Sequence, residues 1–305
     1  TFFTTTLAGI QWAGKDPLEL NNFTTGLTYA SAILFFLSCH EFGHYFAARL
    51  HNVNTTLPYF IPFPPVPFLL NFGTLGALIR MRSLAPSRKA MFDIGVAGPI
   101  VGFLACLIIL VVGFKTLQGP DYMLSIHPDY DFKLNSVPGL QGIPLEFGNT
   151  LLYGFLAETL ADPQTQFIPP MTEIYHYPLL CVGWFGLFVT AMNLIPIGQF
   201  DGGHIAYTMF GDLHKKIAFA AFIVLIALGL PSVLDLIIQT IVTSLTGEKT
   251  AQIVPFAEYS WWAWLLWAFI SYRVVGLVHP PLPDDTPLDP RRMTIGWLCF
   301  AVFVV

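Results

Sequence analysis

The sequence is short of charge. Only 11% of its 305 residues are charged, whereas a soluble domain carries about 25%. Because 54% of the residues are hydrophobic, most of the chain must face something other than water, which excludes an ordinary soluble protein. Basic patches with interleaved aromatic residues are absent, so nucleic acid is not an expected partner.

Cysteine is scarce as well. The four cysteines lie singly in apolar segments, without the CxxC pairs of zinc ribbons or the spacing of a disulfide framework. We expect them to be small buried apolar residues. The chain starts at Thr1 without a methionine and stops at Val305 inside an apolar run, so both ends look trimmed.

Long uncharged stretches are abundant, and several reach the roughly 20 residues with which a helix spans a bilayer. They predict an all-α polytopic membrane protein in the lipid bilayer. It divides into an N-terminal flank at 1–26, a core at 27–241 and C-terminal accessory spans at 242–305. The six predicted spans cover about 27–50, 91–114, 177–198, 217–241, 259–278 and 294–305.

The segments between the spans have their own signals. Prolines at five positions between Leu57 and Leu70 exclude a helix there, and Gly73 to Met81 reads as a short extended strand. Gly98 and Gly102 have the GxxxG spacing that lets a second helix approach closely. Residues 115–175 form a long polar loop with room for a small subdomain.

The lysines and arginines predict the orientation of these spans. Ten of these basic residues fall on one side of the predicted membrane. The other side has four, and most of the aspartates and glutamates lie there too. This distribution puts the loops 51–90, 199–216 and 279–293 in the cytoplasm or the equivalent stroma. Thr1 then lies on the opposite side.

An HExxH sequence, His40-Glu41-Phe42-Gly43-His44, lies inside the first predicted span. On a helix, residues four positions apart share a face, so both imidazoles can bind one zinc ion, and Glu41 can act as a general base on water. A random chain of this composition would contain the pattern roughly 0.005 times. Two core histidines beside a stray glutamate are the alternative, but an ionised carboxylate at bilayer depth costs about 2.5–3.5 kcal/mol.

Zinc hydrolysis needs a third protein ligand. The best candidate is Asp201, where Pro196 and Gly198 should break the third span and two glycines follow. Asp201 as a helix N-cap is the competing interpretation. His204 could replace or assist Asp201. Asn193 could hydrogen-bond a substrate carbonyl or oxyanion, and a helix-packing amide is equally compatible with the sequence.

Together these residues resemble the site-2 protease family of intramembrane zinc metalloproteases. The resemblance covers the first three spans: CHEFGHYFAAR at 39–49, GPIVG at 98–102 and NLIPIGQFDGGH at 193–204. It implies a Zn²⁺ centre of His40, His44 and Asp201, with Glu41 as catalytic base and Asn193 holding substrate.

The resemblance also implies regulated intramembrane proteolysis, in which a membrane-tethered regulator or another transmembrane protein is the substrate. The loop 115–175 looks too short for a PDZ domain, so the chain is closer to the PDZ-lacking branch of plastid and cyanobacterial type. A bacterial or plastid membrane is then the expected location, with the site nearer the cytoplasmic or stromal side. An extended edge within 57–81 could hold an unwound substrate by strand addition, or form a membrane-dipping loop.

Two other functions remain open on the sequence. A zinc-binding transporter or inactive scaffold would need no base at Glu41, and a transporter would carry ionisable residues in several spans. A membrane-anchored HExxH protease could take Glu146, Glu158 or Glu173 as its third ligand, although the predicted topology puts these across the membrane.

Overall fold

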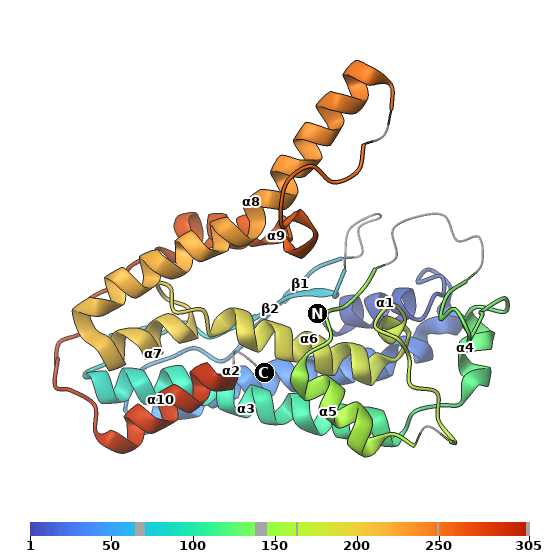
Figure 1. The fold of residues 1–305 in the computed structure, drawn as a ribbon. Coiled ribbons are helices and arrows are strands. Elements are labelled where there is room, and N and C mark those ends of the chain that lie inside the picture. Colours follow the sequence, from blue (N-terminus) through green and yellow to red (C-terminus); the bar gives the residue numbers. More distant parts are fainter. Residues whose placement is uncertain (65–70, 138–144, 163, 249, 303–305) are drawn as a thin grey trace. The chain divides into compact units, whose positions relative to one another are not determined.

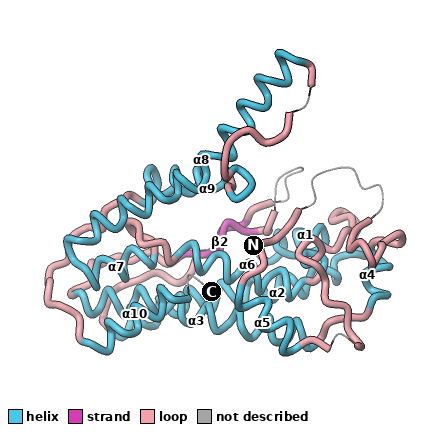
Figure 2. The backbone as a smooth tube through the Cα atoms, in the orientation of Figure 1, coloured by secondary structure: helices cyan, strands magenta, loops and turns pink. Residues whose placement is uncertain are grey.

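The computed structural model describes residues 1–64, 71–137, 145–162, 164–248 and 250–302, and their backbone is mostly helical (Figures 1 and 2). Pro65, Pro67 and Phe303 to Val305, which belong to predicted segments, lie outside these ranges. The helices are α1 Phe2–Trp12, α2 Leu27–Leu50, α3 Arg88–Lys115, α4 Pro120–Ile126, α5 Leu151–Leu160, α6 Pro178–Asn193, α7 Asp201–Phe210, α8 His214–Thr246, α9 Ala263–Ile270 and α10 Pro290–Val302.

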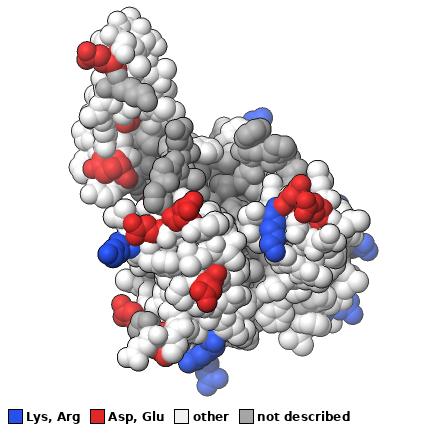
Figure 3. Space-filling model, turned by 90° about the vertical axis from the view of Figure 1, so that its right-hand side faces the viewer, with Lys and Arg blue, Asp and Glu red and all other residues white. Residues whose placement is uncertain are grey.

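The chain divides into two compact units. The first comprises Thr1–Leu84, Ala97–Met192 and Ala301–Val305, and the second comprises Ala85–Val96 and Asn193–Phe300. Charged side chains are sparse on the face that Figure 3 shows, as the composition requires.

Three helical segments of the described chain are long and apolar enough to cross a membrane: Leu20–Leu50, Arg88–Lys115 and Asp201–Thr246. They contain the first, second and fourth predicted spans. The third and fifth are shorter than predicted, since the apolar helices there are Pro178–Asn193 and Ala263–Val275. Sixteen residues of α6 extend about 24 Å at 1.5 Å per residue, less than the roughly 30 Å hydrocarbon core. Six spans therefore stay a prediction.

A two-stranded antiparallel sheet corrects the all-α prediction. Strand β1 Tyr59–Pro62 pairs with β2 Thr74–Leu78, with an irregularity between Phe60 and Pro62. The predicted strand within 73–81 is thus confirmed, and no described residue of 57–64 is helical. The Thr74 hydroxyl donates to the Ile61 carbonyl at 2.8 Å, which supports the pairing beside a proline that cannot donate.

The core of the first unit lies around α2, α3 and α6. Tyr29, Ile33 and Phe36 of α2 are buried with Cys106 and Cys181, so these cysteines pack as apolar residues. The flank 1–26, for which the sequence predicted no element, contains α1. Its buried face includes Ala8 and Ile10.

The predicted loop 115–175 is a small subdomain over its described residues. Helices α4 and α5 lie in it, and its buried core joins residues of the loop to the ends of α3 and α6: Leu110, Phe114, Leu117, Met123, Tyr130, Phe147, Tyr153, Leu156, Ile174, Tyr177 and Leu180. The cost of burying polar backbone explains why so long a segment forms helices of its own.

The second unit contains two further carboxylates within predicted spans, Asp93 and Asp235, which bear on the transporter alternative. Asp93 receives two hydrogen bonds from Arg292, at 2.8 and 2.7 Å. Asp235 of α8 accepts from the backbone N–H groups of Ile253 and Val254, at 2.7 and 2.8 Å. Both are committed to contacts within the fold, so they do not indicate an ion path.

Candidate functional site

Helix α2 carries the HExxH sequence on a buried face. His40, Glu41 and His44 are 4%, 7% and 7% exposed. The buried Tyr29, Ile33 and Phe36 hold α2 in the core of the first unit. The three polar side chains are therefore placed in an apolar environment by a helix that continues through them to Leu50.

The two imidazoles point toward each other. Nε2 of His40 and Nε2 of His44 lie 3.2 Å apart, and the ring centroids are 4.9 Å apart at an interplanar angle of 77°. Ligands at about 2.0–2.1 Å from a tetrahedral zinc ion are separated by about 3.3 Å. The pair thus has the spacing of two imidazole ligands on one zinc ion.

Glycines of α3 make the space for these rings. A Cβ atom on Gly98 would overlap Nε2 of His44, and one on Gly102 would lie 2.9 Å from Nδ1 of His40. A Cβ on Gly43 would come within 2.7 Å of the Ala97 carbonyl oxygen. The GxxxG spacing, predicted to admit a second helix, admits α2 and at the same time the two imidazoles. A cradle of this shape fits a metal held by both rings.

Asp201 belongs to the second unit, where it is the first residue of α7 and half-buried. Phe200 occupies the N-cap position, so the alternative in which Asp201 caps the helix is wrong. Helix α6 ends at Asn193, before Pro196 and Gly198 as predicted, and Gly198 has a φ of 53°.

The glycine pair after Asp201 has a structural cause. A Cβ atom on Gly202 would overlap the Leu194 carbonyl oxygen, and one on Gly203 would overlap the carbonyl oxygen of Gly198. Both glycines therefore let α7 pack directly on the broken segment that precedes it. Asp201 is thereby fixed at the point where the backbone turns into α7.

Asn193 and His204 also lie in the second unit. Asn193 is the last residue of α6 and half-buried. Nδ1 of His204 lies 2.8 Å from Nε2 of His279, and the His279 ring stacks on Tyr207 at 4.3 Å. His204 thus belongs to a ring cluster of the second unit. The joint role of Asp201 and Asn193 with the α2 histidines stays a prediction.

Among the three glutamates weighed as alternative ligands, Glu146 and Glu158 are exposed. Glu173 is 7% exposed and lies with His127 and His176, whose potential ligand atoms are within 4.8 Å of one another. The sequence alone predicts no role for these two histidines. The spacing Glu173-x-x-His176 was a weak signal for a cluster, but nothing in the sequence pairs it with His127.

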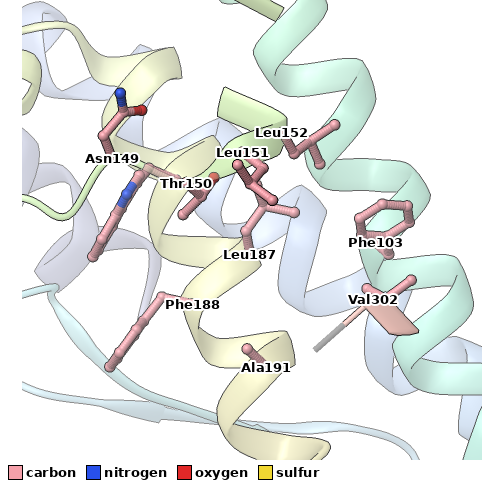
Figure 4. A pocket seen from close by; sticks show the side chains of 10 residues that line it. Phe103, Asn149, Thr150, Leu151, Leu152, Leu187, Phe188, Ala191 and Val302 are labelled. Carbon is pink, nitrogen blue, oxygen red and sulfur yellow. The ribbon is translucent and has the colours of Figure 1, made fainter. Parts of the chain in front are cut away.

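A cavity of about 330 Å³ in the first unit contains none of the predicted site residues (Figure 4). It is lined by Phe103, Asn149, Thr150, Leu151, Leu152, Trp184, Leu187, Phe188, Ala191 and Val302. No lining side chain of this cavity is charged or is a usual zinc ligand.

Comparison with known proteins gives a consistent result. The profile of peptidase family M50 matches residues 28–234. The probable zinc metalloprotease EGY1, chloroplastic, of Arabidopsis thaliana is 32% identical over 185 residues, which are 61% of this chain and 30% of that protein. The rice protein of that name (Oryza sativa subsp. japonica) is 31% identical over 189 residues, which are 61% of this chain and 28% of the rice protein.

The probable zinc metalloprotease EGY2, chloroplastic, of Arabidopsis thaliana is 27% identical over 288 residues, which cover 93% of this chain and 41% of that protein. The chain therefore spans well under half the length of these relatives. No solved structure matches it.

Proposed function

This chain belongs to peptidase family M50, and we propose that it is an intramembrane zinc metalloprotease, which hydrolyses peptide bonds in or near transmembrane segments of its substrates. The observation that carries the proposal is the pair of buried imidazoles, 3.2 Å apart, on a helix apolar enough to span a membrane. The relatives named as probable zinc metalloproteases support the zinc.

His40, His44 and Asp201 would hold the zinc ion, which when bound stabilises negative charge on the oxygen of the scissile carbonyl. Glu41 lies between the two histidines in sequence and is buried beside them. Its carboxylate takes a proton from the attacking water and returns it to the leaving amine. Asn193 would hydrogen-bond the substrate carbonyl, so that the peptide bond is held in one orientation.

A membrane-spanning substrate must unwind before its peptide bonds become accessible, because the helix hydrogen bonds protect them. The β1–β2 hairpin offers an extended template for the unwound segment. Leu75 and Leu78 of β2 are 66% and 44% exposed, so their side chains are available to a substrate strand added along this sheet. We propose a membrane-tethered regulator or another transmembrane protein as the substrate.

We place the protein in a plastid or bacterial membrane with six spans, of which α6 and α9 are short. The relatives named chloroplastic support a plastid membrane. The excess of lysine and arginine in the loops 51–90, 199–216 and 279–293 supports a stromal or cytoplasmic location for those loops. His40 and His44 lie in the later half of α2, which supports a site nearer that side.

The first test compares the wild type with Glu41→Gln in detergent, measuring zinc content and cleavage of a panel of single-span substrates. The exposed Glu248→Gln is the matched control. We expect Glu41→Gln to keep its zinc and to lose at least about 100-fold in cleavage, a typical contribution of a general base. Zinc retention with undiminished cleavage, or no cleavage of any substrate by the wild type, would argue for the non-peptidase function.

The third ligand is tested by Asp201→Asn, with Asp212→Asn as control because the Asp212 side chain is 97% exposed. Loss of an outer partner of a zinc ligand costs about 10–100-fold in affinity, so loss of a direct ligand should cost more than that. If Asp201→Asn binds zinc as the wild type does while Glu146→Ala or Glu158→Ala does not, a glutamate is the third ligand instead.

A further inference from the structure

A second group of zinc-ligand side chains lies in the first unit, away from α2. His127 follows α4, whereas Glu173 and His176 precede α6. Segments separated by 49 positions in the sequence thus bring two imidazoles together. The proposed protease chemistry uses none of the three residues.

Hydrogen bonding determines which atom of His176 faces the group. Its Nδ1 lies 2.8 Å from the Trp12 carbonyl oxygen. A carbonyl oxygen can only accept, so Nδ1 carries the proton and Nε2 presents a lone pair. That lone pair points at Nε2 of His127, 3.1 Å away. A carboxylate or carbonyl bond on the far nitrogen is the usual way in which a zinc-binding histidine is oriented.

The three atoms form a triangle whose edges are within a few tenths of an ångström of those on one face of a zinc tetrahedron. Besides the 3.1 Å between the two imidazole nitrogens, Oε2 of Glu173 lies 3.7 Å from Nε2 of each histidine. Tetrahedral zinc with ligands at about 2.0–2.2 Å has edges of about 3.3–3.5 Å. Two imidazoles and one carboxylate are a donor set that zinc takes in proteins.

Burial makes the group costly without a cation. The Glu173 side chain is only 9% exposed, and its buried Oε2 accepts no hydrogen bond from the described residues. The buried hydroxyls of Tyr130 and Tyr177 also lack hydrogen-bond partners there. A buried carboxylate without hydrogen bonds is unfavourable unless it becomes protonated, and a divalent cation removes that cost.

We propose that His127, Glu173 and His176 form a second zinc site, with a structural role in the subdomain between α3 and α6. The His127 side chain is 25% exposed, which provides an entry path for the ion. Bound zinc ties the end of α4 to the segment before α6 and, through the Trp12 carbonyl, to α1. Three protein ligands leave a fourth position for water.

The competing interpretation is a metal-free hydrogen bond between the two imidazoles. Metal counting separates the two. Purified protein is stripped with a chelator, dialysed in detergent against excess Zn²⁺ and then against zinc-free buffer, and analysed by elemental mass spectrometry. We expect about two zinc ions per chain in the wild type, one in Glu173→Gln, one in His44→Ala and none in the double variant, because each variant removes a different site.

Glu173→Gln keeps the shape of the side chain and removes its charge, so the subdomain can fold without the metal. Far-UV circular dichroism checks this, and His51→Gln, outside both groups, is the matched histidine control. Two zinc ions in Glu173→Gln, or a single wild-type ion that disappears only in His44→Ala, would overturn the inference. A single wild-type ion that disappears only in Glu173→Gln would support this site and reject the proposed one on α2.

Discussion

The two histidine pairs of the first unit have nearly the same geometry but different supports. The Nε2 atoms lie 3.2 Å apart in α2 and 3.1 Å apart in the subdomain, and the ring centroids are 4.9 and 5.0 Å apart. In α2 both rings project from one helix into a glycine cradle. In the subdomain, the rings come from separate segments, and one is oriented by a backbone carbonyl.

This difference determines how each pair should respond to loss of metal. The i, i+4 spacing of a helix fixes the α2 pair before any ion arrives. The subdomain pair exists only while the end of α4 and the segment before α6 stay together. Metal removal should therefore leave α2 ordered and loosen the subdomain. Larger side chains at Gly98 or Gly102, in contrast, should displace only the two α2 imidazoles.

The largest effect is expected from filling the cradle. Gly98→Ala puts a methyl group where Nε2 of His44 lies, and Gly102→Ala puts one 2.9 Å from Nδ1 of His40. Displacement of a catalytic group by about 1 Å costs roughly 100-fold in rate. We expect Gly98→Ala to lose at least that factor in cleavage, and Gly102→Ala to lose less because the ring can shift slightly.

Gly148→Ala is the control, since a Cβ atom there would meet nothing within 4 Å. It should cleave as the wild type does. Zinc counting completes the test: Gly98→Ala should lose the α2 ion and retain the ion bound by the subdomain. Unchanged cleavage by Gly98→Ala would show that the α2 rings do not need this position in the active protein.

The contrast between the pairs also explains what could be predicted from the sequence. The α2 pair is local, so the helix period alone places His40 and His44 together. His127 and His176 meet through the tertiary packing of a subdomain core, which no local period reveals. The end of α6 was predictable for the same reason as the α2 pair: Pro196 and Gly198 act locally on the backbone, and α6 ends at Asn193. In contrast, the prolines excluded a helix without revealing that β1 and β2 pair.

An intermediate effect is expected on backbone dynamics. Removal of zinc with a chelator should speed amide hydrogen exchange in residues 120–131 and 171–177 by about 10-fold, because loss of a tie between segments lowers the local opening free energy by about 1.4 kcal/mol. Residues 36–44 of α2 should change little, since their hydrogen bonds belong to a continuous helix. Mass spectrometry of peptides measures both regions at once.

The Glu173→Gln variant provides the matching control. Its subdomain should already exchange at the faster rate and should not respond to the chelator. Equal acceleration in α2 and in the subdomain would contradict the idea that the two pairs are supported differently.

The smallest effect concerns pH and isolates the second site in the His44→Ala background. Zinc binds the ionised carboxylate, and burial raises the pKa of Glu173 to about 7. Below that pH, each zinc ion displaces one proton, so affinity should rise about 10-fold per pH unit between about 5.5 and 6.5 and level off above 7. His176, whose pKa burial lowers to about 4, is already neutral in this range. The other titratable neighbours are His127, whose pKa burial also lowers, and Tyr130, Tyr175 and Tyr177, whose pKa values burial raises.

The free energy of unfolding of the metal-free protein should vary little over the same pH range, because Glu173 and His176 change it in opposite directions. Folded Glu173 keeps a proton between pH 4.5 and about 7 that the unfolded chain releases, so its contribution to stability falls as pH rises. Folded His176 lacks a proton between about 4 and 6.5 that the unfolded chain binds, so its contribution rises. The two offset each other up to about pH 6.5.

Isothermal titration with Zn²⁺ at several pH values, in buffers of different ionisation enthalpy, counts the proton released when zinc binds. A wild-type slope retained in Glu173→Gln would assign the proton to another group.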